Sequence, residues 1–143
     1  MGKIKLSDTL QFLTAKLNKI TGSEFDFSLE LDDPQVATGD VVRARAVLRA
    51  PEGKDRTITR VRMQLAGQVQ SEGQWEEYEQ TADAVNDVPL PGGHEYVIPI
   101  VIKIPHQAVF SEDGGNWRLR AEAVVDRSVT PRDEVVVEVV EEG

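Results

Sequence analysis

Residues 91–105 read PGGHEYVIPIVIKIP, and the pattern within them indicates the fold class. After a proline-glycine turn, apolar side chains recur at every second position, at Tyr96, Ile98, Ile100, Ile102 and Ile104. This spacing places them on one face of a strand, which we expect to fill a hydrophobic core. The other face carries Val97, Pro99, Val101 and Lys103. Because proline cannot donate a backbone hydrogen bond to a ladder, Pro99 is expected at a sheet edge or a bulge.

Six further segments show the same period of two, separated by turn residues. The predicted strands, this one included, are residues 24–31, 41–50, 57–69, 74–83, 95–104, 116–126 and 134–141. Short, half-buried strands joined by short turns are typical of two antiparallel sheets packed face to face. The predicted fold is therefore all-β, a seven-stranded immunoglobulin-like antiparallel β-sandwich.

The first 22 residues have a different period. Leucine and isoleucine recur at spacings of four and three residues, at Leu6, Leu10, Leu13, Leu17 and Ile20. Such spacing places them on one stripe of an amphipathic helix. The chain is thus expected to comprise an N-terminal helix, residues 1–22, and a β-sandwich domain, residues 23–143.

This leucine stripe is a candidate interaction surface, because a β-sandwich does not require the helix. It could cover its own sandwich, form a homo-oligomer, pair with a partner helix, or lie on a membrane surface, where its lysines would suit the headgroups. We favour contacts within the protein or its dimer over partner and membrane contacts. The outward-facing Val97 and Val101 need a cover, so we predict that the stripe packs against them, in the same subunit or a neighbouring one.

Composition narrows the range of functions. The chain has 143 residues, no cysteine, a net charge of −9 and a pI of about 4.7. The lack of cysteine excludes thiol catalysis, disulfides and cysteine-based zinc sites, and fits a reducing compartment. The negative charge disfavours nucleic-acid binding. Since no signal-peptide pattern or long apolar segment is present, we expect a cytoplasmic protein.

Four motifs resemble parts of one arrestin-type domain. They are GDVVRARAVL at 39–48, RVRMQLAG at 60–67, LPGGHEY at 90–96 with its continuation to Pro105, and NWRLRAEA at 116–123. Among bacterial proteins they are similar to the arrestin-like sporulation-control family, over roughly residues 24–141. The resemblance implies an arrestin-type sandwich with an adaptor or regulatory role. Arrestins carry two such sandwiches in tandem, and this chain has the length for one.

Arginines on the outer faces of two predicted strands form a second candidate site. Because the third and sixth predicted strands would be neighbours, Arg60, Arg62, Arg118 and Arg120 would form one basic field. Such a field could recognise a phosphorylated or acidic peptide. The alternative, which we favour, is a cross-strand ion-pair ladder with Glu77 and Glu79 on one side and Glu134 and Glu138 on the other.

Acidic residues gather in the loops expected at one end of the sandwich: Asp32, Asp33, Asp40, Glu72, Glu112 and Asp113. They could bind calcium, for which Asp32, Asp33, Asp40 and Asp113 are the candidate ligands, or a basic segment of a partner. The alternative, which we favour, is that they are solvated turns. His94 and His106 lie at opposite ends of one strand, so they cannot share a metal ion and are expected to be exposed.

The sequence supplies no nucleophile with its base and no general-acid pair, so neither an enzyme nor a cofactor is expected. The first functional hypothesis is a non-catalytic module that binds partner proteins as an adaptor or regulator. The alternative is a self-associating structural component that uses the N-terminal helix and its strand edges.

Overall fold

Strands make up most of the described structure. The computed structural model describes residues 25–84 and 87–142. The strands are β1 (Asp26–Leu31), β2 (Gln35–Ala37), β3 (Val41–Arg49), β4 (Arg56–Ser71), β5 (Gln74–Ala84), β6 (Val88–Leu90), β7 (Glu95–Lys103), β8 (Trp117–Val125) and β9 (Arg132–Val140). One 3₁₀ turn, η1 (Ser111–Asp113), precedes β8.

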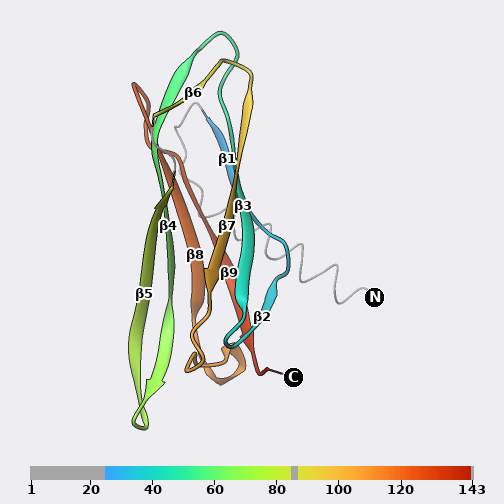
Figure 1. Cartoon of the computed structure of the whole chain (residues 1–143), viewed down its shortest axis with the longest axis vertical. Coiled ribbons are helices and arrows are strands. Elements are labelled where there is room, and N and C mark those ends of the chain that lie inside the picture. The colour runs from blue at the N-terminus through green and yellow to red at the C-terminus, as the bar shows by residue number, and fades with distance from the viewer. Residues whose placement is uncertain (1–24, 85–86, 143) are drawn as a thin grey trace.

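The strands form two sheets (Figure 1). The small sheet has three strands in the order β1-β3-β7, all antiparallel. The large sheet has six strands, in the order β2-β9-β8-β4-β5 with β6 paired to β4. The backbone N–H of Leu29 in β1 donates to the buried carboxylate of Asp133 in β9, which ties the two sheets together along one side.

The predicted all-β fold is confirmed, and each of the seven predicted strands is present. The strand count was wrong, because β2 and β6 were not predicted. Each has three residues, too short to show a period of two. The expectation of wholly antiparallel sheets was also wrong, since β2 runs parallel to β9.

The core lies between the sheets and follows the predicted alternation. Ile98, Ile100, Ile102 and Ile104 are buried, and Tyr96 is half-buried against them. Pro99 lies on β7, which is an edge strand of the small sheet as its missing N–H requires.

Trp117 is the largest fully buried side chain, and a glycine makes room for it. A Cβ atom on Gly67 of β4 would lie 2.2 Å from the Trp117 ring. The indole N–H donates to the carbonyl of Val109 at 2.9 Å, and the ring of Tyr78 lies 5.8 Å away, centroid to centroid. Gly67 is therefore required by the packing of the tryptophan rather than by its own backbone conformation.

A long hairpin extends from the rest of the molecule at lower left in Figure 1. Its strands, β4 and β5, are joined by Glu72 and Gly73, whose φ angles are 51° and 79°. Positive φ at both positions is the signature of a two-residue type I′ turn. No residue of β5 is fully buried, although Tyr78, Ala82 and Ala84 are partly buried against the core.

The predicted N-terminal helix, with Leu6, Leu10, Leu13, Leu17 and Ile20, lies outside the described residues. The part of the chain that is described contains no helix with the length and apolar character needed to cross a membrane.

Candidate functional site: interaction surfaces of the two sheets

The outer face of the large sheet carries the predicted arginines. Arg60 and Arg62 lie on β4, and Arg118 and Arg120 lie on β8, its hydrogen-bonded neighbour. The strand order β5-β4-β8-β9 is the one that the ladder hypothesis required. The four arginines therefore share one outer surface, with acidic strands on both sides.

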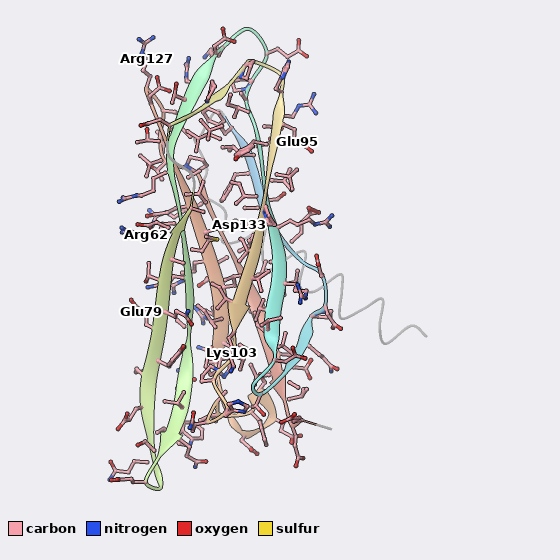
Figure 2. All side chains as sticks on the ribbon, in the orientation of Figure 1. Arg62, Glu79, Glu95, Lys103, Arg127 and Asp133 are labelled. Atoms are coloured by element: carbon pink, nitrogen blue, oxygen red, sulfur yellow. The ribbon has the colours of Figure 1, made fainter. Side chains whose placement is uncertain are left out.

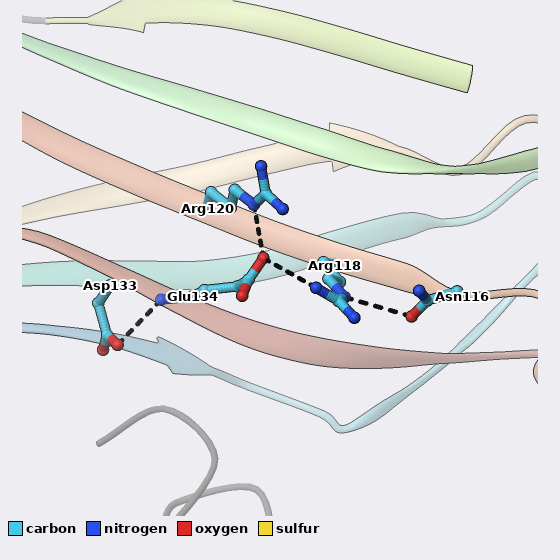
Figure 3. A network of polar contacts seen from close by, with 5 residues as sticks. All are labelled: Asn116, Arg118, Arg120, Asp133 and Glu134. Atoms are coloured by element: carbon cyan, nitrogen blue, oxygen red, sulfur yellow. Dashed lines mark hydrogen bonds and ion pairs between the residues drawn. The ribbon is translucent and has the colours of Figure 1, made fainter. Parts of the chain in front are cut away.

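Three of these four arginines form ion pairs, with two carboxylates between them. Glu134 on β9 accepts a short hydrogen bond from Nε of Arg120, and its Oε1 lies 3.8 Å from Nη1 of Arg118 (Figure 3). Asn116 fixes Arg118 further by accepting a hydrogen bond from its Nε at 3.3 Å. Arg62 pairs with Asp83 of β5. The surface is an ion-pair ladder, as the alternative hypothesis expected.

The ladder partners are partly different from those predicted. Glu134 is a partner, but Glu77 accepts a hydrogen bond from the amide of Gln68 and Glu138 accepts one from the amide of Gln35. Arg60 differs from the other arginines, because its Nε is buried and makes no hydrogen bond within the described residues.

An open hollow of about 550 Å³ lies on this face. Three residues that line it, Arg62, Glu122 and Arg132, lie in one cross-strand row. Asp83 continues this row on β5, so the sign of the charge alternates across four strands. Such a row presents donors and acceptors of both signs and no concentrated positive field. We therefore infer that these charged side chains keep the face hydrated and help to set the strand register, and that the face is poorly suited to bind a phosphate group.

The ion pair of Arg62 and Asp83 gives a prediction for pH. A hydrogen bond from Nε of Arg62 at 3.1 Å, together with the positive charge of Arg62, lowers the pKa of Asp83, and the same hydrogen bond raises the pKa of Arg62. The stabilisation is therefore present above the unfolded-state pKa of about 3.9 and is lost as the pH falls through the lower folded-state pKa.

Replacing Arg62→Gln should raise the pKa of Asp83 towards its ordinary value, as measured by carboxyl-carbon NMR titration. Arg49→Gln, on the other sheet, is the control and should leave that pKa unchanged. An equal Asp83 pKa in wild type and Arg62→Gln would show that the pair does not form in solution.

The outer face of the small sheet shows a different arrangement, in three columns. The register places Asp26 and Glu30 of β1 beside Arg49 and Arg45 of β3, and these beside Glu95 and Pro99 of β7. Carboxylates thus line one edge and arginines follow the middle strand, to which Arg43 also belongs. Oδ1 of Asp32 lies 3.8 Å from Nε of Arg45.

The β7 column of this face is apolar. Val97 and Val101 are 44% and 57% exposed, with Pro99 between them. Glu95 and Lys103 mark the two ends of the strand (Figure 2). The predicted outward orientation of both valines is confirmed. The leucine stripe that was predicted to cover them lies outside the described residues.

The acidic loop residues do not form a metal site. Among the described residues, no three histidine or acidic side chains lie together as a metal site would require. Two of the candidates instead bond the nearby backbone: Asp33 accepts a hydrogen bond from the N–H of Gln35, and Asp40 accepts one from the N–H of Val41. Asp32 faces Arg45 instead of the loops, and Asp113 lies in η1. His94 and His106 are exposed, as expected.

Three exposed apolar residues were missed by the sequence analysis, and the least exposed of them is Val136 on β9, at 39%. Trp75, near the tip of the β4–β5 hairpin, is 48% exposed, and Val129, in the turn between β8 and β9, is 56% exposed. The signal for Trp75 was its position beside a turn, in a strand whose other residues are mostly polar.

Comparison with known proteins supports the fold. No family model matches the chain, and no curated protein matches its sequence. Among solved structures, the chain is similar to Spo0M, a sporulation control protein from Bacillus subtilis, with a TM-score of 0.65 and 12% identity. The match covers 87% of this chain and 51% of the Spo0M chain, so the protein spans about half the length of the one it resembles. The resemblance to the arrestin-like sporulation-control family is thus confirmed at the level of fold.

Proposed function

We propose that the protein is a non-catalytic protein-binding module with an adaptor or regulatory role, acting in the cytoplasm. The observation that carries the proposal is the exposed apolar column of β7, formed by Val97, Pro99 and Val101, beside the arginines of β3. The similarity in fold to a sporulation control protein is consistent with a regulatory role.

Apolar side chains next to arginines are a favourable composition for a protein interface. Burial of Val97 and Val101 by a partner would remove apolar surface from water, at roughly 25 cal/mol per Å². Arginine is enriched in the centres of such interfaces, because its planar guanidinium can bond acceptors while its stem packs. Arg43, Arg45 and Arg49 lie on the same face as the two valines and could contribute in this way.

Photo-crosslinking tests this proposal. A benzophenone amino acid at position 97 should crosslink a partner protein in cells, and the same group at position 129 serves as the control. With the identified partner, the double variant Val97→Asp, Val101→Asp should bind at least about tenfold more weakly, whereas Val129→Asp should bind like wild type. Crosslinks only to further copies of this chain would favour a self-associating component instead. Equal crosslinking at positions 97 and 129 would contradict the proposed surface.

A further inference from the structure

Among the described residues, β5 is the outermost strand of the large sheet, and one of its sides is unpaired. The strand order ends at β5, and within the described residues no other strand pairs with Gln74–Ala84. The strand is long, contains no proline, and pairs with β4 along its whole length without a register shift. A sheet edge of this kind is the geometry to which an extended peptide adds as a further strand.

Strand parity identifies which backbone groups of β5 face outward. The N–H of Gln70 donates to the carbonyl of Gln107, and the carbonyl of Gln68 accepts from the N–H of Val109. Both residues of β4 therefore direct their backbone groups away from β5, as non-hydrogen-bonded positions of an antiparallel pair do. Their partners in the register, Trp75 and Glu77, must direct theirs to the open edge.

Alternation extends this pattern along the strand. Glu79, Thr81 and Asp83 follow Trp75 and Glu77 at intervals of two, so their N–H and C=O groups also face the open edge. The even-numbered residues bond β4 instead. The closing pair of the type I′ turn, Ser71 and Gln74, has the same parity, because the pair that flanks a two-residue turn is hydrogen-bonded.

The charge of β5 indicates the chemistry of the strand that would fit. Its sequence, QWEEYEQTADA, has carboxylates at Glu76, Glu77, Glu79 and Asp83 and no basic residue. A second copy of β5 would place like charges opposite one another, which disfavours self-pairing. A basic strand would be attracted to the same edge.

Exposed side chains near this edge also suit a basic, partly apolar strand. Glu79 is exposed, and Figure 2 shows it on the part of β5 below Arg62. The exposed Trp75 lies at the hairpin end and offers an apolar contact next to this acidic edge. Such an anchor beside a strand edge is the usual means by which strand addition gains specificity.

We propose that the open edge of β5 binds an extended, basic segment of a partner protein as an additional strand of the large sheet. This inference rests on the proposed protein-binding function and assigns it a second surface, apart from Val97 and Val101. Hydrogen bonds from the odd-numbered backbone groups supply the register, and lysine or arginine side chains of the segment meet Glu77, Glu79 and Asp83.

A synthetic nonapeptide that alternates lysine with valine, capped at both ends, is the probe. We expect it to bind the full chain in titration calorimetry at low ionic strength. In hydrogen-exchange NMR, bound peptide should slow exchange of the amides of Trp75, Glu77, Glu79, Thr81 and Asp83 at least about tenfold. Amides of the even-numbered residues, already bonded to β4, should change much less. Protection that does not follow this parity would overturn the proposal.

Two protein variants test the backbone and the charge separately. Thr81→Pro removes an edge-facing N–H that β4 does not use, so the sheet should persist while peptide affinity falls at least about tenfold. Thr81→Val is the matched control and should bind like wild type. Glu79→Lys should weaken binding at least about fivefold, whereas Glu95→Lys should have a smaller effect, because it makes the same change in net charge at an exposed position on β7 of the small sheet, far from Glu79 (Figure 2).

A modified peptide keeps the test independent of protein folding. N-methylation at alternate residues removes ladder hydrogen bonds but keeps the charge, and we expect at least about tenfold weaker binding from one of the two alternating patterns. If both methylated peptides and Thr81→Pro bind like their parents, attraction is only electrostatic and the proposal fails. Loss of peptide binding with crosslinking at position 97 intact would remove this inference and leave the proposed function standing.

Discussion

The variant Trp117→Ala is expected to lower the free energy of unfolding by about 3–5 kcal/mol. The ring is fully buried, and its removal would leave a cavity beside Gly67 and orphan the carbonyl of Val109. Urea unfolding at an unchanged m-value measures the loss. Trp75→Ala provides the matched control, because Trp75 is about half exposed, and should cost under about 1 kcal/mol.

The neighbouring glycine allows a test of the geometry. Gly67→Ala should cost about 2–3 kcal/mol, because the added Cβ overlaps the Trp117 ring and the indole must shift. In the Trp117→Ala background the same change should cost much less, since the overlap no longer exists. The two effects are then strongly non-additive, as a double-mutant cycle would show. Additive losses would contradict the close packing of Trp117 on Gly67.

The alternation of side chains predicted most of this fold. The period of two located each long strand to within a few residues and oriented the isoleucines of β7 correctly, because one face of each strand had to be buried. β2 escaped prediction because its position depends on a long-range parallel pairing with β9, for which a three-residue strand carries no local pattern.

The surface was less predictable than the core. Strand order placed the arginines of β4 and β8 together, but their partners depend on exact cross-strand register, which the sequence did not specify. Asp83 thus became a ladder partner in place of Glu79. Asp33 and Asp40, two of the residues considered for a calcium site, instead accept hydrogen bonds from nearby backbone N–H groups, as short acidic side chains in turns often do.

The role of Asp133 was also missed, because its sequence PRDE resembles a polar turn. In the structure Asp133 points inward from β9, is 3% exposed, and accepts hydrogen bonds from the N–H groups of Leu29 and Glu134 at 3.0 and 2.9 Å. The first of these bonds joins the two sheets. β1 is an edge strand, and the N–H of Leu29 points away from its neighbour β3. The buried carboxylate of Asp133 supplies the acceptor that this N–H needs.

Asp133→Ala should therefore lower the free energy of unfolding by about 2–3 kcal/mol, since the N–H of Leu29 would remain buried without this acceptor. Asp133→Asn keeps one acceptor oxygen and should lose less. Asp126→Ala is the matched control, because Asp126 accepts a similar backbone hydrogen bond from Thr57 at a half-exposed position, where water can replace it. We expect Asp126→Ala to cost about 1 kcal/mol.

Hydrogen exchange at the amide of Leu29 gives the local measure. In Asp133→Ala this exchange should accelerate by more than the global loss of stability explains. Equal costs for the alanine variants at 133 and 126 would show that the connection between the sheets does not depend on the buried carboxylate.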